Sequence, residues 1–274
     1  MTEIKIAILV NSCDAYSDLW PYFFKFLKEN IDNTDLYNIY LNTESKTEID
    51  AVLPVTIINT KQDGKDKWGK RLINSLSKIK EDYVVVLMDD FFLKKPMPSQ
   101  DLLELISIMK MEDRIATIYL SNVFSQIFTE SKYTHLVEVP KKSNYRLNSA
   151  PALWRKTKLL SYIRETDNPW AWEYFGTCRT NYTDDIFLCT PKEQPIYDYA
   201  HAIYRGKWLG KDINPLVEKF NINIDTSVRG VVLETDSLPK RSFKWKIQFI
   251  LEGIKMVGFD AIKEVLRDKK NAIK

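Results

Sequence analysis

The chain has 274 residues and a formal net charge of +3, and 45% of its residues are hydrophobic, which is ordinary for a globular protein. The cysteines Cys13, Cys178 and Cys189 have neither paired spacing nor nearby histidines, so they support neither a disulfide framework nor a zinc site and indicate reduced thiols in a cytosolic protein. No segment resembles a signal peptide, a membrane span or a nucleic-acid-binding module, so no nucleic-acid partner is expected.

Strand and helix patterns alternate through the first 120 residues. Apolar strand patterns are predicted at residues 4–10, 38–41, 55–58, 83–88 and 115–120, and helical spacing at 21–30, 68–79 and 101–111. This alternation predicts an α/β fold with a mostly parallel central sheet flanked by helices.

The pattern is less regular beyond residue 120. Strand-like segments at 135–139 and 145–153 precede a basic helix from Arg155, and Asn168-Pro169-Trp170 is typical of a helix start. Because we find no internal repeat and no low-complexity linker, we predict a single domain over residues 1–235 and a basic C-terminal helical tail over 236–274.

Two adjacent acids, Asp89 and Asp90, end the apolar run at 83–88. Desolvated like charges repel, so such a pair indicates a nearby cation. A hard divalent ion, Mg²⁺ or Mn²⁺, takes oxygen ligands and commonly completes its shell with phosphates. Ligands also gather beyond the carboxyl ends of strands in open α/β sheets. The hypothesis is a metal-dependent enzyme acting on a diphosphate-bearing substrate; the alternative is a pair of turn acids neutralised by Lys94 and Lys95.

Six segments then form a recognisable set: NSCDAYSDLW at 11–20, Trp68 with Arg71-Leu72, DDFFL at 89–93, PALWR at 151–155, NPWAWE at 168–173 and RGKW at 205–208. In this order they resemble bacterial polysaccharide-building glycosyltransferases over most of residues 4–235. The resemblance implies a GT-A-like, nucleotide-sugar-dependent transferase of capsule or surface-glycan assembly. The acidic pair would be a form of the DxD signature of that fold, although the spacer residue between the two acids is absent here.

The resemblance also implies roles at the metal and the donor. Asp90 would bind the metal directly, Asp89 would contact the ribose or metal-bound water, and His201 would be a further metal ligand. A lone histidine is otherwise most often a core or surface residue.

Further donor contacts are expected from Asn11 and Asp14, which follow the first strand, where a base and ribose would lie. Lys207, beside Gly206, and Arg71 would neutralise the departing nucleoside diphosphate. The competing interpretations are a loop cap for Asp14 and solvated charges for Lys207 and Arg71.

Glu173 lies among aromatic residues that would raise its pKa toward that of a useful base. The resemblance places the catalytic base of an inverting sugar transfer at this position, with Trp170 and Trp172 binding the acceptor. A helix-surface glutamate is the alternative, and a retaining reaction stays open because the stereochemistry depends on Glu173. A second acidic pair, Asp184 and Asp185, is interpreted as part of a turn.

Between residues 240 and 274 the chain has ten Lys/Arg against four Asp/Glu, interspersed with aromatic residues. This segment is either an interfacial helix on anionic lipid, at the inner face of the plasma membrane, or a helix that packs on the domain. The expected reaction transfers a sugar, from a UDP-sugar first of all, to a growing lipid-linked glycan. A sugar-phosphate nucleotidyltransferase and a non-catalytic glycan-binding protein are the alternatives; the absence of glycine from residues 11–14 counts against the first.

Overall fold

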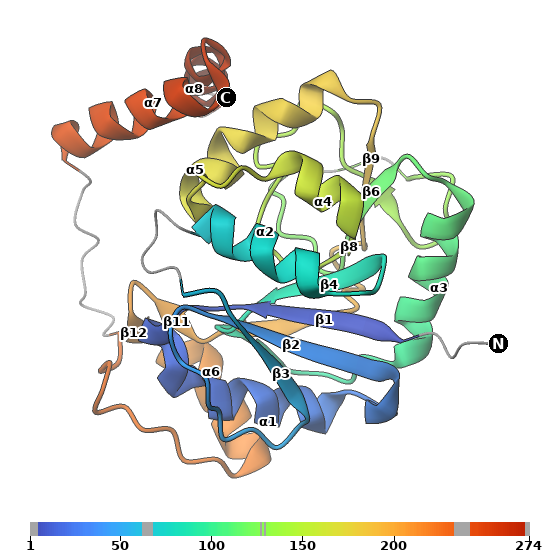
Figure 1. The fold of residues 1–274 in the computed structure, drawn as a ribbon, viewed down its shortest axis with the longest axis vertical. Coiled ribbons are helices and arrows are strands. Elements are labelled where there is room, and N and C mark those ends of the chain that lie inside the picture. Colours follow the sequence, from blue (N-terminus) through green and yellow to red (C-terminus); the bar gives the residue numbers. More distant parts are fainter. Residues whose placement is uncertain (1–4, 62–67, 127, 129, 233–241, 272–274) are drawn as a thin grey trace.

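The computed structural model describes residues 5–61, 68–126, 128, 130–232 and 242–271. Its centre is a sheet with the strand order β3-β2-β1-β4-β8-β6-β9-β7, in which β7 and β8 run against the direction shared by the other strands (Figure 1). The predicted mostly parallel α/β sheet is therefore confirmed. The strands are β1 (Ile6–Asn11), β2 (Tyr37–Thr43), β3 (Val55–Asn59), β4 (Tyr83–Met88), β6 (Ile115–Tyr119), β7 (Val137–Glu138), β8 (Ala152–Arg155) and β9 (Ile186–Cys189).

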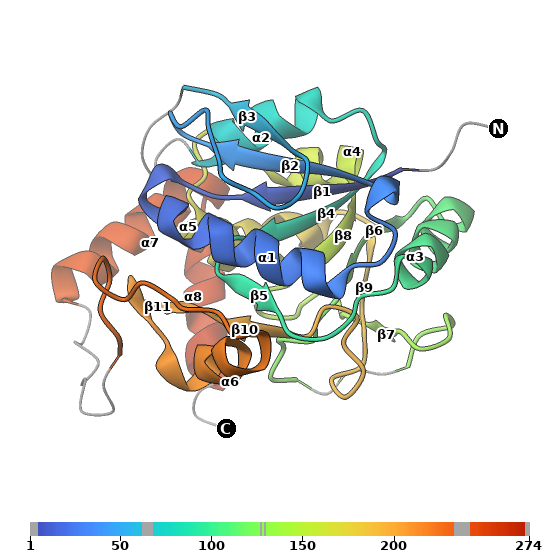
Figure 2. The ribbon, with the colours of Figure 1, turned by 90° about the horizontal axis from the view of Figure 1, so that it is seen from below.

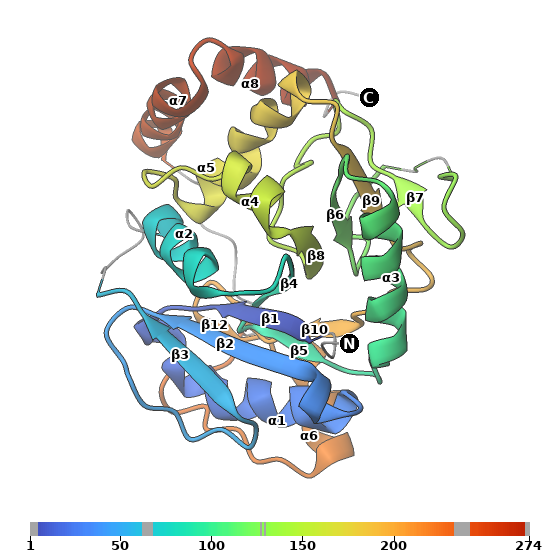
Figure 3. The ribbon, with the colours of Figure 1, turned by 45° about the vertical axis from the view of Figure 1, so that its right-hand side comes forward.

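Helices cover both faces of this sheet, so successive residues of its central strands are buried on opposite sides. Ile8 of β1 belongs to the core shared with α1, α3 and α6, whereas Leu9 belongs to the core shared with α2 and α4. Figure 3 shows α2 on one side of β1 and β2, and α1 with α6 on the other. Both cores share one sheet, which makes this body a single domain. The helices are α1 (Trp20–Asn30), α2 (Trp68–Lys78), α3 (Ser99–Met111), α4 (Lys156–Tyr162), α5 (Pro169–Tyr174) and α6 (Gly210–Phe220).

Two short strand pairs extend from the carboxyl end of β4. β5 (Phe91–Leu93) pairs antiparallel with β10 (Tyr199–His201), and Phe91 lies opposite His201. β11 (Ile203–Tyr204) and β12 (Lys207–Trp208) form a hairpin directly after β10. In Figure 2, β5 and β10 lie on the side of the main sheet that α1 and α6 cover. This pairing brings the residue after Asp90 beside a histidine from a distant part of the chain.

The C-terminal helices α7 (Phe243–Val257) and α8 (Asp260–Asn271) pack on α5 and on the 3-10 helix η4 (Gly176–Tyr182). The ring of Phe249 lies 4.9 Å from that of Phe175, and a Cβ atom added to Gly253 would lie 2.5 Å from the Phe175 ring. Glycine at this position therefore permits the close approach of α7. The predicted domain boundary at 235/236 and the first basic residues of the tail lie outside the described residues.

No helix in the described part of the chain is both long enough and apolar enough to cross a bilayer.

The predicted strand at 145–153 is wrong over most of its length. Only Ala152–Arg155 forms a strand, β8, and residues 144–150 form a loop in front of it. Tyr145 has a φ of 54°, in the left-handed region, which a strand does not accommodate. The Asn148 side chain donates to the Tyr145 carbonyl and accepts from the Ala150 amide. Such local side-chain bonds compete with the pairing of a sheet.

Candidate functional site

The two acids predicted at the end of β4 form a turn between β4 and β5, and they face different surroundings. Asp89 is buried, and its Oδ2 accepts hydrogen bonds from the Ser12 hydroxyl and from Trp20 Nε1, the latter at 3.3 Å. Burial and the neighbouring charge of Asp90 raise the pKa of Asp89 well above its usual value, although these hydrogen bonds oppose the shift. Asp89 thus connects β4 to the loop after β1.

Asp90 faces His201, whose Nδ1 lies 4.0 Å from Asp90 Oδ2. The side chain of Asp90 is 18% exposed and that of His201 is 47% exposed, so the pair borders solvent. Burial raises the pKa of Asp90 to about 6, while the nearby His201 and Arg229 limit the rise. The β5–β10 pairing fixes this arrangement, because the Ala202 amide also donates to the Asp90 carbonyl at 2.8 Å.

A divalent cation fits the chemistry of this pair. Carboxylate and imidazole groups are both ligands for Mn²⁺, and the exposed side of the pair leaves room for water or phosphate oxygens. A bound cation would also favour the charged form of Asp90, which the protein alone stabilises poorly. Three or more His, Cys, Asp or Glu side chains do not gather anywhere in the described residues in an arrangement that could hold a metal. Protein ligation at this position would therefore come from Asp90 and His201.

Arg229 is a cation of this site that the sequence analysis missed. Its guanidinium forms an ion pair with Asp18 at 2.6 Å and lies over the ring of Tyr16, 4.4 Å from the ring centre. It also donates to the Gly206 carbonyl at 3.4 Å. Arg229 therefore joins the loop after β1 to the turn before Lys207. The sequence around Arg229 contains no local pattern that would predict this role.

Asp14 connects two loops, as its capping alternative predicted. Its carboxylate accepts the backbone amides of Glu44, Ser45 and Lys46 at 3.1, 3.0 and 3.4 Å. Partial burial raises the pKa of Asp14, but the hydrogen bonds from Ser45 and these amides outweigh it, so the pKa lies below its usual value. A ribose contact from the same carboxylate stays a prediction.

Arg71 and Asn11 also lie near the carboxyl ends of β1 and β2. Arg71 is buried, forms an ion pair with Glu44 at 2.9 Å and donates to the Ser12 carbonyl at 3.4 Å. The side-chain oxygen of Asn11 accepts from Asn42 at 2.7 Å, across the β1–β2 pairing. These residues hold the carboxyl ends of β1 and β2 together beside Asp89.

Lys207 is exposed in β12, next to the turn of the β11–β12 hairpin. Arg205 and Gly206 form this turn with φ values of 52° and 83°. Glycine adopts positive φ without strain, and the carbonyl of Gly206 in this turn accepts from Arg229.

Glu173 lies in α5, which begins where the sequence predicted: Asn168 accepts the Ala171 amide as the N-cap and Pro169 opens the first turn. Its Oε1 accepts the Ser149 amide at 2.7 Å. Burial raises the pKa of Glu173, and the hydrogen bond from Ser149 opposes the shift without cancelling it. These are the conditions that tune a carboxylate toward general-base catalysis.

A cavity of about 860 Å³ joins the two parts of the site, since both Glu173 and His201 line it. Aromatic rings, amide or hydroxyl groups and two small aliphatic side chains form the rest of its described wall: Phe91, Val123, Phe124, Ser125, Gln126, Asn144, Tyr145, Asn148, Ser149, Ala150 and Tyr199. The cavity therefore lies between the desolvated Glu173 carboxylate and His201, which in turn faces Asp90.

The two tryptophans expected to bind the acceptor do not line this cavity in the described structure. Trp172 is 3% exposed, packs 5.5 Å from Trp68 and donates to the Tyr162 carbonyl at 3.1 Å. Trp172 is thus a core residue, because its ring is enclosed on the α2 side of the sheet. Trp170 is half-exposed at the start of α5. The aromatic residues described as lining the cavity are instead Phe91, Phe124, Tyr145 and Tyr199.

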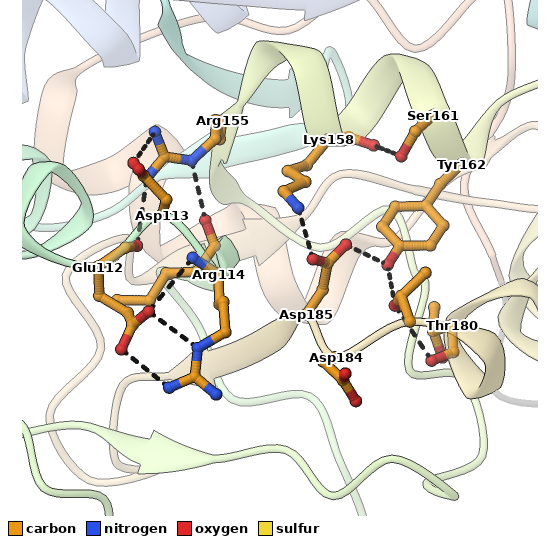
Figure 4. Close-up of polar contacts among 12 residues, drawn as sticks. Glu112, Asp113, Arg114, Arg155, Lys158, Ser161, Tyr162, Thr180, Asp184 and Asp185 are labelled. Atoms are coloured by element: carbon orange, nitrogen blue, oxygen red, sulfur yellow. Dashed lines mark hydrogen bonds and ion pairs between the residues drawn. The ribbon is translucent and has the colours of Figure 1, made fainter.

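The second acidic pair is structural. Asp185 is buried and accepts from Lys158 Nζ and from the Tyr162 hydroxyl, both at 2.6 Å, whereas Asp184 points away from them (Figure 4). Asp184 is 89% exposed and forms an ion pair with Lys141. Both acids lie beside β9 and α4, and neither is among the residues described as lining the cavity.

No protein-family model and no curated protein matches the sequence. Among solved structures, TarS residues 1–349 from S. aureus aligns with a TM-score of 0.46 and 12% identity over 68% of this chain and 57% of that one. Its complex with UDP-GlcNAc gives 0.40 and 10% over 70% and 60%. The glycosyltransferase GlyE of Streptococcus pneumoniae TIGR4 gives 0.34 and 15% over 57% and 36%.

The chain thus spans less than two thirds of the length of these solved proteins. The residues of the site, rather than these likenesses, carry the functional proposal.

Proposed function

We propose that this protein is a GT-A-like glycosyltransferase that moves a sugar from a nucleotide-diphosphate donor to a glycan acceptor. The observation that carries the proposal is the cavity lined by both His201 and Glu173. One end offers the Asp90–His201 pair for a diphosphate and its cation, and the other offers a buried carboxylate for an acceptor hydroxyl. The ordered sequence resemblance to surface-glycan transferases supports the same reaction.

At the donor end, Asp90 and His201 would hold Mn²⁺ or Mg²⁺, which would offset the charge of the diphosphate and make it a better leaving group. Arg229 lies close enough to Asp90 to lower its pKa, and it adds a fixed positive charge to this end. Lys207, in the hairpin that contacts Arg229, would contact the departing nucleoside diphosphate. A UDP-sugar is the first donor to test.

At the acceptor end, Glu173 would accept the proton of an acceptor hydroxyl as that oxygen attacks the anomeric carbon. The new bond joins the acceptor oxygen to the anomeric carbon, and the bond from that carbon to the diphosphate oxygen breaks with its electron pair. In the proposed reaction the attack comes from the face opposite the diphosphate, which would give a product of inverted configuration.

A ligand screen tests the donor side directly. The melting temperature is measured with UDP-, GDP-, CMP- and dTDP-sugars, each with and without Mn²⁺. A ligand at a hundred times its dissociation constant stabilises the folded state by about 2.7 kcal/mol, so we expect one base to raise the melting temperature only when the metal is present. If no nucleotide changes it, the transferase proposal is wrong and a glycan-binding protein becomes the better interpretation.

The outward surface of α7 and α8 supports a contact with anionic lipid, which would bring a lipid-linked acceptor to the site. The face of α7 that does not pack on α5 exposes apolar side chains four residues apart, with lysines beside them. Figure 1 shows this helix at the edge of the molecule. Apolar residues bordered by lysines are typical of helices that lie in a membrane interface. The exposed residues are Phe243, Ile247, Leu251, Phe259, Ile262 and Leu266, and the lysines are Lys244, Lys246, Lys255 and Lys263.

Co-sedimentation with vesicles checks this surface. We expect the protein to bind vesicles that contain phosphatidylserine more strongly than neutral vesicles, and the double variant Phe243→Ser/Ile247→Ser to lose most of this binding. The matched control is Val228→Ser/Val231→Ser, which removes exposed apolar residues outside these helices. Equal binding by both double variants would contradict the proposed lipid contact.

A further inference from the structure

The loop at residues 144–150 forms the cavity wall beside Glu173, and hydrogen bonds fix it along its whole length. The Arg146 carbonyl accepts from the Tyr119 hydroxyl at 2.6 Å, and the Leu147 amide donates to the Thr177 hydroxyl at 2.9 Å. The Asn144 side chain accepts from Arg267 of α8 at 3.1 Å. The loop is therefore fixed by contacts from three separate parts of the fold.

The side chain of Arg146 is buried and anchors this loop to the domain. It donates to the carbonyls of Val139, Thr180 and Asp185 at 3.3, 3.4 and 3.0 Å, and it lies over the ring of Phe187. A buried guanidinium that is satisfied by carbonyls strongly resists movement, because any displacement leaves a charged donor without its partners.

Tyr145, between these fixed points, is strained and yet open to the cavity. Its φ of 54° lies in the left-handed region, which is unusual for a bulky residue and costs on the order of 1–3 kcal/mol. Its side chain is 45% exposed, lines the cavity and meets the ring of Tyr174 edge-on at 5.7 Å. Residues held in such conformations by their surroundings cluster at ligand sites.

The charge of the cavity wall restricts what can bind beside Tyr145. The residues described as lining it include no lysine or arginine, and their polar groups include the amide of Gln126 and the hydroxyls of Ser125 and Ser149. Glu173 supplies negative charge in the same wall. A uronic acid or a phosphorylated sugar beside Tyr145 would thus meet the Glu173 carboxylate, and the guanidinium of Arg267 behind Asn144 is already paired with Glu264. Amides and aromatic rings instead suit neutral hydroxyl groups and the apolar faces of a sugar.

We propose that Tyr145 is the platform of the acceptor subsite and that the acceptor residue that reacts is an uncharged sugar, stacked on this ring beside Glu173. The strained backbone presents the ring to the cavity, and the fixed loop holds it at a constant position relative to the carboxylate. This inference rests on the proposed transferase function for the direction of the reaction, although the sugar-binding subsite itself is independent of the donor.

Saturation-transfer NMR on the full chain tests the subsite with methyl glycosides of glucose, galactose and N-acetylglucosamine, and with methyl glucuronide as the charged comparison. We expect at least one neutral glycoside to bind and methyl glucuronide to bind more weakly. Tyr145→Asn should weaken that binding about tenfold, whereas Tyr145→Phe should retain it. Asparagine tolerates positive φ, so the Asn variant should remain folded, which its melting curve verifies.

Unchanged binding by Tyr145→Asn, no binding by any neutral glycoside, or preference for the glucuronide would overturn the proposal. The outcomes separate the two proposals. Glycoside binding without any nucleotide-induced change in melting temperature retains the subsite and rejects the transferase. Nucleotide stabilisation without glycoside binding retains the transferase and rejects the subsite.

Discussion

The Glu173→Gln variant should transfer sugar about 10²- to 10⁴-fold more slowly than the wild type and bind the nucleotide donor equally well. Glutamine retains the shape of the side chain and can still accept the Ser149 amide, but it cannot take a proton from the acceptor hydroxyl. Steady-state kinetics with varied donor and acceptor concentrations measure kcat, and donor titration measures the affinity. Glu165→Gln, an exposed change in the same region, is the matched control and should leave kcat unchanged.

The pH dependence of the wild type should identify the same group. Burial raises the pKa of Glu173, so its basic form is lost at a higher pH than for an ordinary glutamate, and kcat should fall as the pH decreases through this raised pKa. A group whose folded-state pKa is raised binds its proton more tightly in the folded state, so its ionisation lowers stability as the pH rises through that value. Glu173→Gln removes this cost and should melt no lower than the wild type at neutral pH. A large loss of stability would show that Glu173 is structural.

The Asp90→Asn variant should lose the metal-dependent rise in melting temperature that a nucleotide sugar gives the wild type. The substitution removes the charge of one of the two side chains available to hold the cation and leaves His201 as a neutral ligand. We expect at least a hundredfold loss of donor affinity in the presence of Mn²⁺, as measured by calorimetric titration, and little change in its absence.

The control for this change is Asp184→Asn, in the second acidic pair, which is exposed and paired only with a surface lysine. It should bind the donor as the wild type does. Unchanged metal-dependent binding by Asp90→Asn would place the cation elsewhere and would require a different role for the pair of acids at the end of β4.

Local sequence patterns predicted those parts of the candidate site that depend on neighbouring residues. The apolar run of β4 and the two acids after it mark a strand that leaves a nonpolar sheet, and Asn168-Pro169 marks the start of α5. These signals are local because hydrophobic periodicity and capping depend on neighbouring residues. They located Asp90 and Glu173.

The remainder of the site depends on contacts between distant segments, which periodicity does not encode. The β5–β10 pairing that brings His201 to Asp90 joins residues more than a hundred positions apart. Arg229 reaches the same area by an ion pair with Asp18. Trp172 was expected to bind the acceptor together with Trp170, although the turn of α5 directs it into the core. An aromatic sequence motif does not indicate which of its rings is buried.

The hydrogen bond from Arg267 of α8 to Asn144 connects the C-terminal helices to the cavity wall. The proposed lipid binding at α7 and α8 and the acceptor binding in the cavity would then be thermodynamically linked. A lipid surface that orders α7 and α8 should raise acceptor affinity, and the acceptor should raise lipid affinity by the same factor. A chain cut before α7 would then retain its donor chemistry but lose the coupling. With the proposed lipid contact, the helices would make efficient transfer depend on a membrane surface.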